Sequence, residues 1–271
     1  FLVTGSISWL YYSDRLLEFP LGTFAIAVAT VILPSLSSRH AEQSMAAFSA
    51  TLDWALKLVV VIALPAAVGL FMLAGPMLAT LFQYGEFTPF DVRMASLSLM
   101  AYALALIGFT LVKVLSPGYF SRQDIKTPVR ISIRAMLLNI VLNLLIVVPM
   151  YVYQVPGAHA GLAAATGLSA IYNATALYRG LRRAEVYAPG AGWAPLLGRV
   201  LFANLVMGLG LWLLAGPLDG WLDADWHERG LRLAGIIFLG LGAYLAALLL
   251  AGLRPRHLRG ATAAPSPPHS V

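Results

Sequence analysis

Long apolar blocks make up most of this chain and constrain its fold more than any other feature. Each block is about the 17–25 residues that a helix needs to cross the hydrocarbon core of a bilayer. A backbone in lipid has to satisfy its own hydrogen bonds, which open strands cannot do. The sequence therefore predicts an all-α, polytopic transmembrane helix bundle with about seven complete spans. The blocks lie near residues 15–36, 53–74, 92–115, 130–150, 158–178, 194–216 and 230–253.

The composition agrees with a membrane protein and excludes several kinds of site. Only 11% of the residues are charged, against roughly 25% in an average soluble domain. The chain has no cysteine, which excludes disulfides, thiol catalysis and cysteine-based metal sites. Its five histidines are scattered, and neither an HExxH nor a GxxxxGK pattern occurs. We therefore expect a transporter and not an enzyme, with no firm metal site and no resident cofactor.

The two ends of the chain differ from the blocks between them. The opening "FLVTGSISWLYY" has no initiator Met and no basic segment, so it is not a signal peptide. We expect residues 1–12 to be the end of an eighth helix, truncated at its start. The last residues, 254–271, are rich in Pro, Ala and Ser, a composition typical of a disordered tail.

The basic residues are distributed unevenly between the two sets of connections. Most of the 18 lie near 37–57, 113–134 and 179–199 and after residue 253. The exceptions are Arg15, Arg93, Arg229 and Arg232. Because Lys and Arg favour the cytoplasmic side, the sequence predicts a cytoplasmic C-terminus. The net charge of +6 then reflects topology and attraction to lipid headgroups, and we expect no nucleic-acid partner.

Three charged residues, Asp14, Arg15 and Glu18, stand at the start of the first block, next to Pro20. An ionisable residue within a span usually faces the bundle interior and marks a transport pathway. Arg15 offers a planar fork of donors that suits phosphate oxygens, and Glu18 is one turn away. The alternative is that Arg15 extends to the membrane surface while the two acids stabilise the start of a helix.

Four stretches resemble, in the same order, the MurJ/MviN family of lipid II flippases of the MOP exporter superfamily. The resemblance covers most of residues 5–180, and the SRQDIKTPV run is its most specific part. The stretches read "YYSDRLLEFPLGTFAIAVATVILPSLS", "LFQYGEFTPFD", "LVKVLSPGYFSRQDIKTPVRIS" and "HAGLAAATGLSAIYNATALY".

The resemblance implies a MATE-like bundle of two lobes around a central cavity, of which this chain is the C-terminal portion. Residues 13–180 would form five spans of one lobe, and residues 181–253 two extra spans that line a groove for a lipid tail. The cargo would be undecaprenyl-pyrophosphate-linked disaccharide pentapeptide, flipped from the inner to the outer leaflet of the bacterial inner membrane. Its pyrophosphate would bind Arg15, which matches an arginine of the family's cavity. The cavity arginines of the family's first helices are absent here.

The sequence contains one candidate site for an ion that could drive transport. Asn139 and Asn143 lie one turn apart, and Thr166 lies in the next apolar block. Their side-chain oxygens are hard ligands that suit Na⁺, and the resemblance implies sodium or the membrane potential as a driving force. Hydrogen bonding between helices is the alternative role for these residues.

The connection "KVLSPGYFSRQDIKTPVR" supplies a second group of candidates. Lys113, Arg122 and Lys126 are placed to receive the lipid headgroup at the cytoplasmic mouth or to close a gate there. The alternative is that they anchor the connection on the cytoplasmic side.

Two other functions remain open on the sequence alone. One is a different exporter of the same superfamily, for polysaccharide lipids or drugs. A drug antiporter needs a carboxylate within the membrane, and Asp14, Glu18 and Asp53 all lie near the ends of spans. The other is a membrane scaffold without transport activity, which would have no need of a charged stripe around Arg15.

Overall fold

The computed structural model describes residues 3–253, apart from the side chains of residues 24–29. This part of the chain is helical and contains no strand, which confirms the predicted fold class. The residues expected to form a disordered tail, 254–271, lie outside the described part. The helices are α1 (Ser6–Ala41), α2 (Met45–Met72), α3 (Ala74–Phe82), α4 (Pro89–Leu115), α5 (Pro117–Phe120), α6 (Lys126–Val152), α7 (Ala158–Arg183), α8 (Trp193–Ala215), α9 (Asp219–Leu222) and α10 (Trp226–Leu250).

Each of the seven apolar blocks forms one long helix. Within the described residues, five segments are both long and apolar enough to cross a membrane: Met45–Met72, Pro89–Phe120, Lys126–Val152, Trp193–Ala215 and Trp226–Leu250. The other long helices are α1 with 36 residues and α7 with 26. The chain is a multi-pass membrane protein whose helices match the predicted blocks in number and order.

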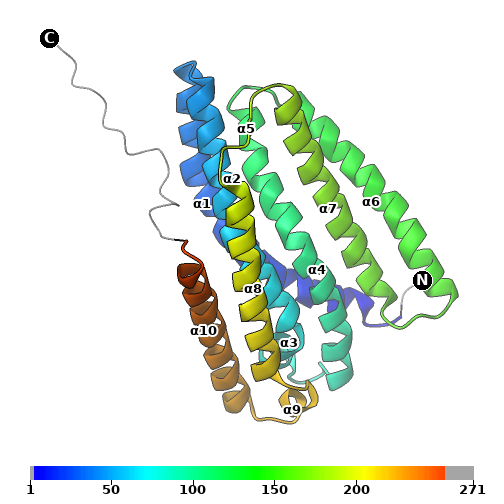
Figure 1. The fold of residues 1–271 in the computed structure, drawn as a ribbon. Coiled ribbons are helices and arrows are strands. Elements are labelled where there is room, and N and C mark those ends of the chain that lie inside the picture. Colours follow the sequence, from blue (N-terminus) through cyan, green and yellow to red (C-terminus); the bar gives the residue numbers. More distant parts are fainter. Residues whose placement is uncertain (1–2, 254–271) are drawn as a thin grey trace.

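Helix α1 differs from the expectation for the start of the chain. Residues 6–12 continue without a break into residues 13–41, so the structure shows no separate helix end before residue 13. The reason is local: no Gly or Pro interrupts residues 6–19, whereas Gly5 has a left-handed φ of 99° and precedes the first turn. Pro20 lies inside the helix, where it removes one backbone hydrogen bond. Figure 1 shows the first part of α1 set at a steep angle to the rest.

The long helices run up and down, so that the connections alternate between two ends of the bundle (Figure 1). At the upper end of Figure 1, α1 meets α2, α4 and α5 meet α6, and α7 leads to α8. These are the connections that hold most of the basic residues. The acidic segment "DGWLDADWHE" belongs to α9 and its neighbours at the lower end.

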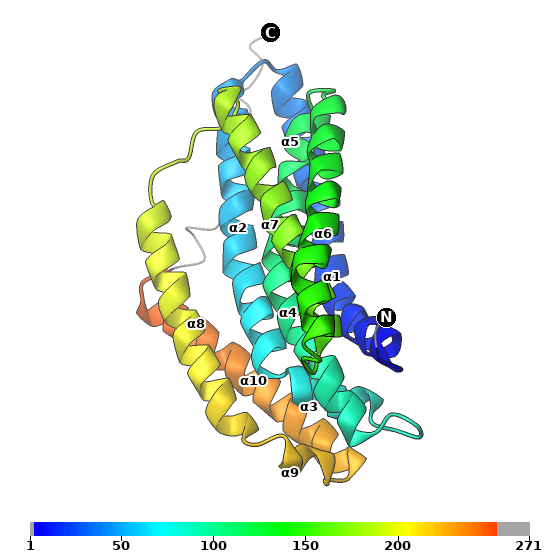
Figure 2. The same cartoon turned by 90° about the vertical axis from the view of Figure 1, so that its right-hand side faces the viewer.

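Helix α4 is the centre of the bundle and packs against α1, α2 and α7, while α6 packs against α7. A capping box starts α4: the Thr88 hydroxyl accepts from the Asp91 amide at 3.3 Å, and the Asp91 carboxylate accepts from the Thr88 amide at 2.8 Å. The same carboxylate accepts from the Trp9 indole at 2.7 Å, which ties α1 to α4. Helices α8 and α10 pair with each other to one side of the bundle (Figure 2).

The α4–α7 contact depends on a glycine, and its replacement should destabilise the fold. A Cβ added at Gly108 would lie 2.8 Å from the Ile171 backbone nitrogen and 2.9 Å from the Ala170 carbonyl carbon. Backbone atoms cannot rotate away, so Gly108→Ala has to push the helices apart. We expect a loss of about 1–3 kcal/mol, the usual cost of overpacking, measured as a lower thermal unfolding temperature in detergent.

The matched control is Gly235→Ala in α10, where an added Cβ meets no atom within 4 Å. This variant should leave the unfolding temperature unchanged or raise it slightly, because Ala favours a helix. Equal stability of the Gly108 variant and the parent chain would show that α4 and α7 are less closely packed than described.

Candidate functional site

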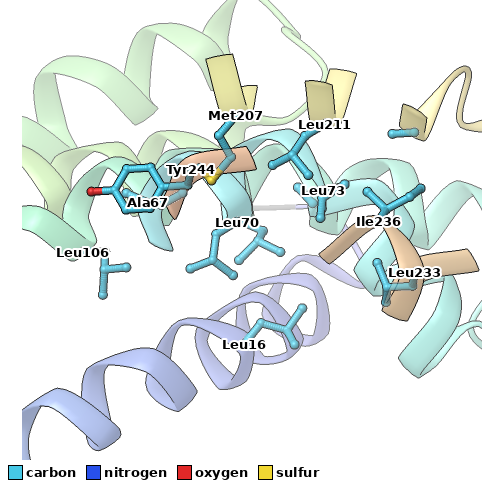
Figure 3. Packing of buried hydrophobic residues seen from close by; sticks show 14 of the residues in the cluster. Leu16, Ala67, Leu70, Leu73, Leu106, Met207, Leu211, Leu233, Ile236 and Tyr244 are labelled. Carbon is cyan, nitrogen blue, oxygen red and sulfur yellow. The ribbon is translucent and has the colours of Figure 1, made fainter. Parts of the chain in front are cut away.

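An apolar groove lies between the terminal helix pair and the rest of the bundle. It has a volume of about 1020 Å³ and is lined by α1, α2, α3, α8 and α10. Figure 3 shows apolar side chains of these helices meeting in this region, among them Leu16, Leu70, Met207 and Tyr244. The Tyr244 hydroxyl donates to the Val61 carbonyl at 2.6 Å, so α10 is hydrogen-bonded to α2 inside an otherwise apolar contact.

Arg15 lies at the edge of this groove. Among the described residues that line the groove, it alone is charged. Its guanidinium donates to Glu18 at 2.8 Å and lies over the Tyr11 ring, 4.9 Å from the centroid. Both side chains of the ion pair are 54% exposed, so the pair contributes little to stability and leaves the guanidinium accessible. The structure thus brings Arg15 and Glu18 together beside an apolar groove, with Arg15 in its lining.

Asp14 does not join them. It is exposed on the same turn of α1, is not among the residues that line the groove, and is not the carboxylate paired with Arg15. Residues three or four apart on a helix share a face, so both Asp14 and Arg15 are neighbours of Glu18 although they are not paired with each other. Of the three predicted headgroup residues, Arg15 alone is among the described residues that line the groove.

A second cavity, of about 470 Å³, lies between α1, α4, α6 and α7. Asn139 and Thr166 line it, and the Asn139 amide lies 3.4 Å from the Thr166 hydroxyl. The Asn143 amide donates to the Asn139 carbonyl oxygen at 3.1 Å. The three residues predicted to hold an ion are therefore neighbours, and they are linked by one hydrogen bond within α6 and one between α6 and α7.

Lys113 lines the same cavity, which the sequence reasoning did not anticipate. The sequence predicts it beside Arg122 and Lys126 at the cytoplasmic mouth, and those two residues follow α5, near the start of α6. There Asp124 accepts from the Thr127 amide at 3.0 Å, and hydrogen bonds from Thr127 lower the pKa of the Asp124 carboxyl. Of the three candidate gate residues, Lys113 alone is among the described residues that line this cavity.

The structure also contains a buried carboxylate to which the sequence reasoning assigned no role. Asp53 is 7% exposed and pairs with Lys57, whose ammonium lies 2.7 Å away. A signal was present in the sequence, because a carboxylate inside an apolar helix with a lysine four residues later predicts an ion pair. The other hydrogen-bond partners of the Asp53 carboxylate lie more than 130 residues away in the chain. Only the folded structure shows that they reach Asp53.

Residues 1–222 match the family described as "Lipid II flippase MurJ". The chain is 50% identical over 263 residues to "Probable lipid II flippase MurJ" of Vibrio cholerae, which covers 97% of the chain and 49% of that relative. It is 35% identical over 256 residues to "Lipid II flippase MurJ" of Burkholderia cenocepacia, covering 94% of the chain and 48% of the relative.

The fold also resembles a solved structure titled "Lipid II flippase MurJ, inward closed conformation". The TM-score is 0.71 at 24% identity, over 90% of this chain and 47% of that one. The chain therefore spans about half the length of the relatives it matches. By its sequence and its fold, the chain belongs to the MurJ family.

Proposed function

We propose that this chain acts as the C-terminal half of a lipid II flippase. The cargo is undecaprenyl-pyrophosphate-linked disaccharide pentapeptide, moved from the inner to the outer leaflet by alternating access. The proposal rests on one observation: an apolar groove of about 1020 Å³ has Arg15 as the one cation among the described residues that line it. The names of the family and of the relatives support the same cargo.

The groove suits a polyprenyl tail in length and in chemistry. Its α10 wall extends from Ile237 to Leu249, which is about 18 Å at the helical rise of 1.5 Å per residue. The hydrocarbon core of a bilayer is about 30 Å thick, so a chain lying in the groove can stay in an apolar medium. Keeping such a tail out of water in this way avoids a cost of about 25 cal/mol per Å² of apolar surface.

Arg15 suits the anionic headgroup. A pyrophosphate that leaves water loses hydration, and a bidentate guanidinium replaces part of it. Glu18 holds the guanidinium at 2.8 Å when no phosphate is bound, and phosphate oxygens then replace the carboxylate. Arg15 thereby exchanges one anionic partner, the Glu18 carboxylate, for another, the pyrophosphate, so its guanidinium always has a counter-charge.

The membrane arrangement follows from the charges at the two ends of the bundle. We propose that the end carrying most of the basic connections faces the cytoplasm, which also places the C-terminus there. In this arrangement residues 13–180 supply one lobe, residues 181–253 supply the helix pair of the groove, and the other half of a full-length relative supplies the second lobe. The protein then lies in the bacterial inner membrane.

Growth rescue tests the proposal. This chain replaces the matching half of the Vibrio cholerae relative, and the chimera is expressed in Vibrio cholerae cells depleted of their own protein. We expect growth to be restored at matched membrane levels. No rescue by a chimera that inserts and folds would favour another exporter of the superfamily or a scaffold without transport activity.

A sodium site is a second candidate function, and Asn143 favours it. Its side-chain oxygen is buried and accepts no hydrogen bond among the described residues. Asn139 and Thr166 line the cavity of Lys113, whose positive charge opposes a cation, whereas Asn143 is not among the residues that line it, so the Asn143 oxygen is the donor that favours a site. We propose that Na⁺ binds the oxygens of Asn143, Asn139 and Thr166 and drives the cycle together with the membrane potential. Lys113 in its cavity, with Arg122 and Lys126 beyond α5, then serves the cytoplasmic gate.

Thermal unfolding of the purified chain in Na⁺ and in K⁺ tests the site. A ligand at 100 times its Kd stabilises the folded state by about 2.7 kcal/mol, so Na⁺ should raise the unfolding temperature and Asn143→Ala should remove the difference. Asn204→Ala is the matched control, because Asn204 on α8 also has a buried, unpaired side-chain oxygen. Equal unfolding temperatures in both salts would eliminate the site.

A further inference from the structure

The buried carboxylate of Asp53 receives more hydrogen bonds than an ion pair with Lys57 requires. Its Oδ2 faces the Lys57 ammonium at 2.7 Å. Its Oδ1 accepts from the Tyr187 hydroxyl at 2.8 Å, from the Gly190 amide at 3.0 Å and from the Trp193 indole at 2.7 Å. A buried charge is costly unless its lone pairs are satisfied. Here one oxygen has three donors and the other has a cation.

All three donors to Oδ1 belong to one segment, the connection between α7 and the first residue of α8. Figure 1 shows this connection passing from the upper end of α7 to the start of α8, beside α2. Three further bonds fix it to α2. The Ser49 hydroxyl accepts from the Ala188 amide at 3.0 Å and donates to the Ala188 carbonyl at 3.2 Å, and the Lys57 ammonium donates to the Ala191 carbonyl at 3.0 Å. The connection is therefore held along its length by three side chains of α2.

The packing around the carboxylate is close and specific. A Cβ added at Gly190 would lie 2.8 Å from Oδ2 of Asp53, so only glycine lets the backbone approach this near. Burial, and then the bond to Asp53, raise the pKa of the Tyr187 hydroxyl, which keeps it protonated as a donor. The contact is a polar cluster whose members come from α2 on one side and from the connection and the start of α8 on the other.

The position of this cluster bears on the groove. Helix α8 packs against α2 and α10, and α10 reaches the rest of the bundle mainly through α8 and α3. Because the connection to α8 is fixed at Asp53, the place where α8 starts is set relative to α2. Through α8 the cluster then sets the distance between α10 and the α2 wall of the groove.

We propose that Asp53 is a positioning residue for the lipid groove: it fastens the α7–α8 connection to α2 and thereby holds α8 and α10 at the spacing that a lipid tail fills. The link to a lipid tail rests on the proposed function, whereas the fastening itself does not. The positioning of α8 can therefore be measured without any substrate.

Spin labels on the full chain measure the fastening. The sequence has no cysteine, so each introduced cysteine is a unique labelling position. One pair joins Leu104 on α4 to Leu205 on α8, and a reference pair joins Leu104 to Leu145 on α6; all three side chains are exposed. In lipid nanodiscs, Asp53→Ala should shift and broaden the α4–α8 distance distribution and leave the α4–α6 distribution unchanged.

Matched variants separate this role from a general loss of fold. Glu42→Ala removes an exposed carboxylate that pairs with Arg39, and it should change neither distribution. Gly190→Ala should shift the α4–α8 distance as Asp53→Ala does, whereas Gly198→Ala, which meets no atom within 4 Å, should not. An unchanged α4–α8 distribution in both Asp53→Ala and Gly190→Ala would overturn the proposal.

A photoreactive polyprenyl pyrophosphate in the same nanodiscs tests the link to the groove. Labelling of the parent chain along α10, lost in Asp53→Ala, supports the proposal, and equal labelling of both contradicts it. Should the parent chain fail to label while the α4–α8 distance still shifts in the variant, the fastening stands and the proposed function fails. The distance measurement thus tests the fastening, and the labelling experiment tests the link to a lipid tail, so that one can be contradicted without the other.

Discussion

Arg15→Ala is expected to abolish growth rescue by the chimera with the Vibrio cholerae relative. Arg15 is the one charged side chain among the described residues that line the groove, and under the proposed function its guanidinium donates two hydrogen bonds to the pyrophosphate. A hydrogen bond to a charged group contributes about 1.5–3 kcal/mol, so each lost bond weakens headgroup binding by at least about tenfold. Growth of depleted cells, with membrane levels of the chimera matched, is the measurement.

Two variants control this experiment. Arg39→Ala is the matched control, because Arg39 also pairs with a glutamate three residues later in the chain, at 2.9 Å, and should rescue fully. Arg15→Lys keeps the charge and loses the planar fork, and it should rescue only partly. Full rescue by Arg15→Ala would reduce Arg15 to an anchor at the membrane surface.

The second large effect is expected from filling the groove. Leu241 lines it, whereas Leu239 on the same helix does not line it and is exposed. Leu241→Trp places an indole where the proposed lipid tail lies, and we expect loss of growth rescue and of labelling by a photoreactive polyprenyl pyrophosphate. Leu239→Trp adds the same bulk to another face of α10 and should retain both.

The unfolding temperatures of the two tryptophan variants show whether either substitution disturbs the fold. Both tryptophan variants should unfold at the temperature of the parent protein in detergent, because each position is at least half exposed and an added ring meets lipid instead of a packed core. Equal rescue by Leu241→Trp and Leu239→Trp would show that the groove does not hold a lipid tail.

The helices could be predicted from the sequence because the physical signal is strong. Each apolar block has to form a helix in lipid, and all seven do so. The start of α1 could not be predicted in the same way. A helix continues until something ends it, and the stretch before Asp14 contains neither Gly nor Pro after Gly5, so residues 6–12 extend α1.

The sites were predictable where their residues are neighbours along one helix. Arg15 with Glu18, and Asn139 with Asn143, follow from helical spacing, and the structure joins each pair. Contacts between distant segments carry no such periodic signal. The approach of Lys113 to the cavity of Asn139 therefore needed the fold.

The same holds for the polar cluster around Asp53. Its ion pair with Lys57 follows from helical spacing, but Tyr187, Gly190 and Trp193 lie more than 130 residues further along the chain. Only the packing of α7 and α8 beside α2 brings them to the carboxylate. The groove is likewise a property of the packing, because its walls come from five separate helices.

Exposure of lipid II on the outer leaflet tests the central claim most directly. Depleted Vibrio cholerae cells carrying the chimera receive an enzyme that cleaves lipid II from outside the inner membrane, and the cleaved fraction is measured. We expect cleavage at the level of cells with their own flippase, and loss of that cleavage with Arg15→Ala. Lipid II that stays uncleaved in cells with a folded, inserted chimera would contradict the account.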